Sequence, residues 1–301
     1  MVSDEVDISV IIVTADNWAD LHPCVESVYR SFTSGRLQVI CVDDCSQEDI
    51  AAQVAQHFPD VHLVNNTAKQ SYPVTNNQGV AAADGRYIML LNDDVVLAEQ
   101  ALDRVVEFLD RHEQAGAASP KLLNPDGTVQ PCVRRFPSLA AALAQSLYLH
   151  RLWPGNRWTG RYYATDIDHS QTQPVPSIGT TAYVMRREAL EQVGGLDEAF
   201  PINFCDLDLN WRIGEAGWQI WLVAYAEATH KGGQTMGRLT LRQLRDYHRG
   251  MLLMYRKHYA PRRLFVINGL VYLGIAVRFL LKAILRIVAL DRLLARRAPD
   301  S

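Results

Sequence analysis

The chain has 301 residues and a formal net charge of −3, with 48% hydrophobic and 21% charged residues. This composition excludes a disordered chain, and 18 Gly and 13 Pro without a period exclude a collagen-like or linker sequence. Five cysteines are an odd number and too few for a disulfide-framed secreted fold, so we expect them to remain thiols.

The charges are distributed unevenly along the chain. Residues 231–301 carry 15 basic and 3 acidic residues, whereas residues 1–230 carry 15 basic and 30 acidic residues. An acidic body favours a site that uses a cation, and a basic tail favours an anionic partner surface. Residues 1–7 contain three acids and no basic residue, which is unlike a signal peptide, so we expect folding in the cytoplasm.

The first 115 residues predict strands that alternate with helices. The predicted strands are 8–14, 37–42, 61–64 and 87–91, and the predicted helices are 17–31, 46–57, 75–83 and 98–112. We expect Asn17 and Ser46 to cap the first two helices. This alternation predicts βαβ units and a mostly parallel sheet, which is an α/β fold.

The pattern is looser beyond residue 115. Residues 135–176 are rich in Trp, Tyr and Pro with little periodicity, which indicates a functional loop region. The predicted elements that follow are a strand at 177–186, helices at 187–193 and 206–216, a strand at 218–223 and a long basic helix at 239–259.

The tail combines an apolar run with a basic stripe. Residues 264–277 are uncharged, but a membrane-spanning helix needs about 20 apolar residues. Arg278, Lys282 and Arg286 then recur every four residues, which favours a helix in the membrane interface and peripheral contact through 264–290. Packing on the domain or on a second copy in a homodimer is the alternative. The basic residues alternate with aliphatic ones rather than stacking aromatics, which argues against nucleic acid.

Two acidic clusters follow predicted parallel strands. They are Asp43-Asp44 and Asn92-Asp93-Asp94, and ligands of open α/β sheets bind at such strand ends. Turn formation or helix capping explains one such site alone, but two neighbouring acidic pairs favour a bound divalent cation. Mg²⁺ or Mn²⁺ commonly bridges to phosphate, and the sequence lacks the common glycine-rich phosphate loops. These features predict a substrate whose diphosphate is bound by the protein through a divalent metal ion.

Six motifs support a family resemblance. They are ISVIIVTADNWADLHPCVESV at 8–28, VDDCS at 42–46, NNQGVAAADGRYIMLLNDD at 76–94, SIGTTAYVMRREALEQVGGLDEAF at 177–200, DLDLNWRIGEAGW at 206–218 and HKGG at 230–233. With them, residues 7–235 resemble the inverting family 2 glycosyltransferases of the GT-A fold, and most closely their bacterial rhamnosyltransferase-like members. The resemblance implies a GT-A domain at 1–235, with a nucleotide-sugar half at about 1–115 and an acceptor half at about 116–235. The basic helical extension at 236–301 would follow it.

The resemblance implies roles for the residues at the strand ends. Thr14 and Asp43 would line the pocket of the nucleotide base. Asn92-Asp93-Asp94 would be the D-x-D-type motif of the family, in which Asp93 reaches the ribose. Asp94 would bind the divalent metal that bridges the two phosphates.

Further roles follow from the later motifs. Asn77 and Gly79 would lie close to the nucleotide, and Gly179 close to the donor sugar. His230 would supply another metal or diphosphate contact. Asp206 would be the general base that takes the proton of the acceptor hydroxyl, in a single displacement that inverts the anomeric carbon.

One departure from the family keeps other functions open. The family usually has Glu-Asp where this chain has Cys205-Asp206, which points to a different acceptor or to weak activity. The alternatives are a nucleotidyltransferase, against which the GGLDE and DLD segments argue, and a non-catalytic scaffold that binds a nucleotide-sugar, which Cys205 keeps open. The second departure is Lys69-Gln70-Ser71-Tyr72-Pro73 in place of a glycine-rich segment, which leaves the donor open.

The acceptor side is predicted from aromatic and basic residues in the loop region. The candidates are Arg134, Arg135, Trp153, Trp158, Tyr162 and Tyr163. Together with the tail, they predict a saccharide or lipid-linked acceptor at the inner face of the cell membrane, in cell-surface polysaccharide biosynthesis. The donor would be dTDP-rhamnose or a UDP-sugar.

Overall fold

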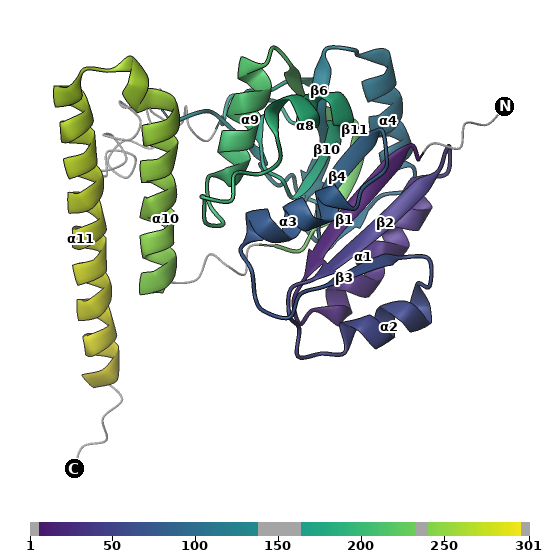
Figure 1. The fold of residues 1–301 in the computed structure, drawn as a ribbon, viewed down its shortest axis with the longest axis horizontal. Helices are drawn as coiled ribbons and strands as arrows, with labels where there is room; N and C mark the ends of the chain where they lie inside the picture. The colour runs from purple at the N-terminus through teal and green to yellow at the C-terminus, as the bar shows by residue number, and fades with distance from the viewer. Residues whose placement is uncertain (1–5, 138–163, 233–239, 296–301) are drawn as a thin grey trace. The chain divides into compact units, whose positions relative to one another are not determined.

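The computed structural model describes residues 6–137, 164–232 and 240–295, which form two compact units (Figure 1). We call residues 1–197 together with 206–232 the sheet unit, and residues 198–205 together with 233–301 the helical unit. Each unit has its own internal contacts and is considered by itself.

A nine-stranded sheet forms the centre of the sheet unit, in the order β3-β2-β1-β4-β10-β6-β11-β5, with β8 paired to β11. The strands are β1 (Ile8–Thr14), β2 (Leu37–Asp43), β3 (His62–Asn65), β4 (Tyr87–Asn92), β5 (Val95–Leu97), β6 (Ala115–Leu123), β8 (Gln173–Pro174), β10 (Ala182–Arg186) and β11 (Gln219–His230). A second, two-stranded sheet pairs β7 (Val133–Arg134) with β9 (Ser177–Ile178).

The main sheet is mostly parallel. β1 pairs in parallel with β2 and β4, β2 with β3, and β6 with β11. β10 is antiparallel to both of its neighbours, β4 and β6, and β5 is antiparallel to β11. The predicted α/β class with a mostly parallel sheet is therefore confirmed. The predicted strand 177–186 is instead two strands, β9 and β10, separated by residues 179–181.

Helices cover both faces of this sheet (Figure 1). α1 (Trp18–Ser31), α2 (Ile50–His57) and α4 (Ala101–Arg111) pack with Val10 and Ile12 in one apolar core. α3 (Tyr72–Ala81), α8 (Arg187–Val193) and α9 (Cys205–Glu215) cover the other face, where α3 lies against Ile11 of β1. Alternate residues of β1 thus serve opposite faces, as expected of a strand buried on both sides.

Of the two predicted helix caps, Ser46 is wrong, and Asn17 occupies the N-cap position of α1 without a capping side chain. Asn17 precedes α1, but its side chain makes no capping hydrogen bond. α2 begins at Ile50, where the Asp49 carboxylate accepts a hydrogen bond from a first-turn backbone N–H at 3.0 Å. The Ser46 hydroxyl instead donates to the Asp43 carboxylate at the end of β2. Ser46 therefore orders the polar edge of the sheet rather than a helix end.

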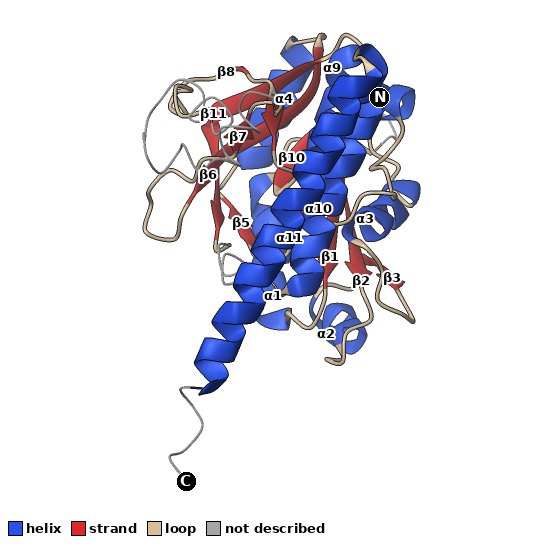
Figure 2. Cartoon of the chain, turned by 90° about the vertical axis from the view of Figure 1, so that its left-hand side faces the viewer, coloured by secondary structure: helices blue, strands red, loops and turns tan. Residues whose placement is uncertain are grey.

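The helical unit contains α10 (Leu241–Met254) and α11 (Phe265–Ala295), which lie side by side (Figures 1 and 2). A π-helical turn, η2 (Tyr255–Tyr259), and a 3₁₀ turn, η3 (Ala260–Arg262), connect them. The Tyr255 hydroxyl donates to the side-chain oxygen of Asn268 at 2.8 Å, and the Asn268 amide donates to the Ala260 carbonyl at 3.0 Å. These bonds fix the connection between the two helices.

α11 exposes its apolar side chains and half-buries its basic ones. Arg278, Lys282 and Arg286 are only partly exposed. The large apolar side chains that α11 exposes are Phe265, Val266, Leu270, Tyr272, Leu273, Val277, Leu280, Leu281, Ile284, Leu285, Ile287 and Val288. Among the described residues, no helix combines the length and the apolar character that crossing a membrane requires.

Candidate active site

The register of the parallel strands brings the predicted site residues to one edge of the sheet. Thr14, at the end of β1, pairs with Asp43 at the end of β2, and Val13 pairs with Asn92 at the end of β4. The Thr14 hydroxyl donates to Oδ2 of Asp93 at 2.8 Å. The structure therefore brings Thr14, Asp43, Asn92 and Asp93 together, as the sequence predicted.

The two acids after β2 are held by different partners. Asp43 is 8% exposed, and its Oδ1 accepts the hydroxyl of Ser46 and also the Ser46 backbone N–H at 3.1 Å. Oδ1 of Asp44 accepts the backbone N–H of Gln70 at 2.8 Å and the side-chain amide of Asn66 at 3.3 Å. No described residue donates to Oδ2 of Asp43, so this oxygen is available to a ligand N–H. Asp44 holds the 66–70 segment, a role that the sequence did not reveal.

Asp93 is a buried carboxylate among other acids. Burial raises the pKa of the Asp93 carboxyl, and the hydrogen bonds from Thr14 and Asn17 partly oppose this. The nearby charges of Asp94 and Asp20 raise it further. Asn17, which caps no helix, therefore stabilises the ionised form of Asp93.

β11 brings His230 to Asp94. His230 pairs with Val95 of β5, and Nε2 of the imidazole lies 3.3 Å from Oδ1 of Asp94. Nδ1 of the same ring lies 2.6 Å from Oε1 of Gln130, which orients the imidazole. The two predicted metal ligands, far apart in the sequence, are therefore neighbours.

The Asp94–His230 pair fits a metal ion that arrives with a phosphate. Within residues 6–137, 164–232 and 240–295, no group of three or more His, Cys, Asp or Glu side chains could hold a metal ion by itself. Mg²⁺ in phosphate-transfer sites is commonly held by one or two carboxylates, substrate phosphates and water. The donor set present is thus too small for a resident metal but sufficient for a metal–diphosphate complex.

Asn77 and Gly79 hold α3 in place. The Asn77 amide donates to the Leu196 carbonyl at 2.8 Å, and its oxygen accepts the Leu196 backbone N–H at 2.9 Å. A Cβ at Gly79 would lie 2.2 Å from Cγ2 of Ile11, so only glycine lets α3 pack this closely on β1. The contact of these two residues with a nucleotide stays a prediction.

Gly179 begins the break between β9 and β10. Its backbone N–H donates to the Cys132 carbonyl at 3.2 Å, and a Cβ at this position would have only Thr181 within 4 Å, at 3.9 Å. The next residue, Thr180, is buried and lies 3.0 Å from the Tyr72 hydroxyl at the start of α3. Thr180 was not among the predicted site residues, although the Gly-Thr-Thr segment, which interrupts an apolar strand, marks a break in the chain at this position.

Asp206 lies in the first turn of α9. Burial raises the pKa of its carboxyl, which the backbone N–H groups of the first turn and the charge of Arg134 partly oppose. A carboxylate with a raised pKa is a better proton acceptor, as a general base requires. Arg134, predicted on the acceptor side, is thus close enough to act on Asp206.

The residues before Asp206 explain the departure at Cys205. Cys205 is 1% exposed, and its thiol donates to the Ile202 carbonyl at 3.1 Å. Phe204 has a φ of 74°, a left-handed conformation that is strained for an aromatic residue. The Cys205 thiol is therefore buried and bonded within the turn that precedes Asp206.

A buried ion pair fixes α9 against the turn after α8. Asp208 is fully buried and accepts a hydrogen bond from Nε of Arg212 at 2.8 Å. The other guanidinium nitrogens donate to the carbonyls of Val193 at 2.7 Å and Gly195 at 2.9 Å. This pair, which the sequence analysis did not single out, positions the helix that carries Asp206.

The remaining acceptor-side candidates are only partly covered. Arg135 forms an ion pair with Asp166, in which Nη2 lies 2.9 Å from Oδ2. Trp153, Trp158, Tyr162 and Tyr163 lie outside the described residues. Their predicted acceptor role stays a prediction.

Comparison with known proteins finds a family model and curated relatives of this sequence. The family model for glycosyl transferase family 2 matches residues 9–194. The chain is 29% identical over 228 residues to an N-acetylglucosaminyl-diphospho-decaprenol L-rhamnosyltransferase of Mycobacterium tuberculosis, covering 72% of this chain and 74% of that protein. It is 27% identical over 229 residues to the O-antigen biosynthesis protein RfbC of Myxococcus xanthus, covering 74% of this chain and 17% of that protein.

Solved structures share the fold. GalNAc-T7 with UDP, GalNAc and Mn²⁺ matches with a TM-score of 0.60 and 16% identity, over 83% of this chain and 48% of that chain. TarS 1-349 of S. aureus in complex with UDP-GlcNAc matches with a TM-score of 0.56 and 15% identity, over 83% of this chain and 66% of that chain. Because the family model spans well over half of the sequence and the structural neighbours share its sheet, the chain belongs to glycosyl transferase family 2 and is a glycosyltransferase of the GT-A fold.

Proposed function

We propose that this glycosyltransferase moves L-rhamnose from dTDP-rhamnose, or a hexose from a UDP-sugar, to a saccharide carried on a lipid. The observation that carries the proposal is the pairing of Asp94 with His230 beside Asp43 and Asp93 at one edge of the sheet. The similarity to a decaprenol-linked rhamnosyltransferase supports the choice of donor and acceptor.

The nucleotide is bound by the ends of β1, β2 and β4. The free Oδ2 of Asp43 accepts the N–H of a thymine or uracil base, and Asp93 accepts a ribose hydroxyl. Asp94 and His230 would hold the divalent metal, which would neutralise negative charge on the diphosphate. Asn77, Gly79 and Gly179 line the same pocket in this proposal.

Asp206 acts as the base. The oxygen of the acceptor hydroxyl forms a bond to the anomeric carbon while the bond from that carbon to the diphosphate oxygen breaks. The hydroxyl proton passes to the Asp206 carboxylate, and the nucleoside diphosphate leaves from the opposite face. The configuration at the anomeric carbon is thereby inverted, and the raised pKa of Asp206 supports its role as proton acceptor.

The acceptor is presented at the inner face of the cell membrane in this proposal. The exposed apolar side chains of α11 support peripheral contact through residues 264–290. Anionic lipid vesicles that sediment the full chain, and fail to sediment a chain ending at residue 263, would support the contact. Equal sedimentation of both chains would contradict it.

Ligand-induced stabilisation tests the donor site. We expect dTDP or UDP with Mn²⁺ to stabilise the full chain by about 2.7 kcal/mol over the unliganded chain when the ligand is at 100 times its Kd. The same concentration of nucleotide without Mn²⁺ should stabilise the chain less. Asp94→Asn should lose the Mn²⁺-dependent part, whereas Asp60→Asn, an exposed control, should keep it. Stabilisation that does not respond to Mn²⁺ in the wild type would contradict metal dependence.

Transfer from labelled dTDP-rhamnose or UDP-GlcNAc to a lipid-linked GlcNAc then tests catalysis. Nucleoside diphosphate binding without any transfer to any tested acceptor would favour the scaffold alternative. Failure of every nucleoside diphosphate to bind would overturn the proposed function.

A further inference from the structure

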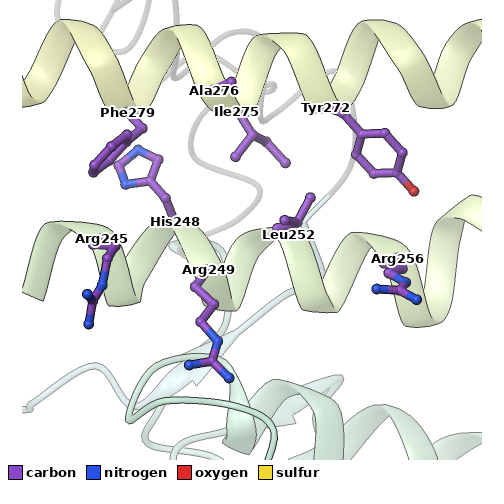
Figure 3. A pocket seen from close by; sticks show the side chains of 9 residues that line it. All are labelled: Arg245, His248, Arg249, Leu252, Arg256, Tyr272, Ile275, Ala276 and Phe279. Atoms are coloured by element: carbon purple, nitrogen blue, oxygen red, sulfur yellow. The ribbon is translucent and has the colours of Figure 1, made fainter.

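A groove lies between the two helices of the helical unit. Its volume is about 650 Å³, within the range of about 300–1,000 Å³ that is typical of ligand pockets. Figure 3 shows His248 and Leu252 of α10 pointing toward Ile275 and Phe279 of α11. These side chains give the groove a largely apolar floor that runs along the helices.

Cations border one side of the groove. Arg245 and Arg249 of α10 and Arg256 of η2 line it, with guanidinium groups directed away from α11 in Figure 3, so their aliphatic stems face the groove. Arg245 pairs with Asp246, but among the described residues no acidic side chain pairs with Arg249 or Arg256. An apolar floor with a cationic border matches a ligand that has an apolar chain and an anionic end.

Among the described residues of this unit, two buried side-chain nitrogens lack a hydrogen-bond partner. His248 is 4% exposed, and its Nδ1 is hydrogen-bonded to the Leu244 carbonyl at 2.7 Å, but Nε2 has no partner. Nη1 of Arg278, on α11, is also buried without a partner. Leaving one such buried group unsatisfied costs about 1–3 kcal/mol, and of these two residues His248 lines the groove.

The charges around His248 are of one sign. Arg278 and Lys282 act on the imidazole, and with burial they lower the pKa of His248. Burial and Arg278 likewise lower the pKa of Lys282. In the part of the helical unit that the structure describes, no acidic side chain pairs with Arg278 or Lys282, whereas Asp246 pairs with Arg242 and Arg245 of α10.

We propose that the groove between α10 and α11 binds the phosphate end and first isoprene units of a polyprenyl phosphate or diphosphate. The apolar floor takes the isoprenoid chain. The phosphate lies at the arginine border, where it pairs with Arg249 and Arg256, which have no acidic partner among the described residues. The choice of an isoprenoid rather than a phospholipid rests on the proposed function, since an isoprenoid carries the saccharide of the related rhamnosyltransferase.

Isothermal titration of the full chain with farnesyl diphosphate tests the ligand class. Inorganic diphosphate and farnesol, which each carry one half of the probe, are titrated in parallel. We expect farnesyl diphosphate to bind at least about tenfold more tightly than either half, because both apolar burial and charge pairing contribute. Equal binding of inorganic diphosphate would overturn the lipid part of the proposal, and equal binding of farnesol would overturn the phosphate part.

Matched variants test the location. Ala276→Trp fills the groove from an exposed position, and Leu273→Trp adds the same indole on α11 outside the groove. Arg256→Gln removes a border charge, and Arg242→Gln removes a charge of α10 that does not line the groove. We expect the first variant of each pair to weaken farnesyl diphosphate binding about tenfold and the second to leave it unchanged. Equal effects within a pair would overturn the site.

The test separates this inference from the proposed function. All four variants should keep the stabilisation by dTDP with Mn²⁺, because they lie in the helical unit. Wild-type protein that binds dTDP but not farnesyl diphosphate would overturn the groove proposal alone. If Ala276→Trp instead disrupts a dimer measured by sedimentation, or if only anionic phospholipid vesicles bind, another occupant fills the groove and the proposal is wrong.

Discussion

Gly79→Ala tests whether close packing of α3 on the central strand builds the nucleotide edge. The added Cβ would lie 2.2 Å from Cγ2 of Ile11, more than 1 Å short of the 3.4 Å at which ordinary contact begins. Ile11 is fully buried, β-branched and fixed between β2 and β4, so its side chain cannot turn aside. The helix must therefore move outward.

The magnitude follows from two opposing effects. Overpacking of this kind costs about 1–3 kcal/mol, and replacing a helical glycine by alanine returns about 0.5–1 kcal/mol. We expect Gly79→Ala to lower the free energy of unfolding by about 1–2 kcal/mol. Gly214→Ala, in α9 of the same unit with no atom within 4 Å of the new Cβ, should raise it by about 0.5–1 kcal/mol.

Chemical denaturation followed by circular dichroism measures both variants against the wild type. A difference of about 2 kcal/mol between the two variants corresponds to about 4–8 °C in Tm for a unit of this size. Because α3 also carries Asn77, Gly79→Ala should weaken nucleoside diphosphate binding, whereas Gly214→Ala should not. The packing argument is refuted if the two substitutions change stability in the same direction by the same amount.

Three further predictions follow from the site. Asp206→Asn should lower turnover by about 10²–10⁴-fold. Burial raises the folded pKa of Asp206, so above that pKa its ionised form destabilises the folded state. The variant should therefore have a higher Tm than the wild type at pH 7, and this difference should disappear at acidic pH. The turnover of the wild type should fall on the acid side at a pH above the usual Asp range, and the variant should lack this fall. Arg212→Met should cost about 3–5 kcal/mol in thermal unfolding, since Asp208 stays buried without its cation, and Asp208→Asn with Arg212→Met together should cost less. Tyr72→Phe removes the hydrogen bond to Thr180, the residue after the proposed donor-sugar contact Gly179, and this loss of about 1 kcal/mol should raise KM for the donor by up to about fivefold. An unchanged KM would show that the contact does not shape the donor site.

The order of elements was predictable because apolar runs mark buried parallel strands. The runs that became β1, β2 and β4 were predicted within one residue at each end. The helix caps were not, because Asn17 and Ser46 are equally good at capping a helix and at bonding a neighbouring carboxylate. The tertiary position of Asp93 decided the role of Asn17, and the turn after β2, which brings Ser46 onto Asp43, decided that of Ser46.

The site was predictable only where it follows directly from strand ends. The proximity of Thr14 to Asp93 follows from parallel register. The approach of His230 to Asp94 depends on β11 pairing with β5, and it was expected only through the family resemblance. The Gly-Thr-Thr interruption marks Thr180, but its partner Tyr72 lies 108 residues away in the sequence, and no sequence pattern links the two.

The place of β10 in the sheet bears on how the protein is made. β4 ends at Asn92, but one of its two neighbours in the sheet, β10, ends only at residue 186 and is therefore synthesised much later. A nascent chain that ends near residue 115 therefore shows an apolar strand with an open edge, which is prone to aggregation until the missing strand arrives. His230 comes later still, so the edge with Asp43 and Asp94 is among the last parts to be completed, although most of its residues leave the ribosome first.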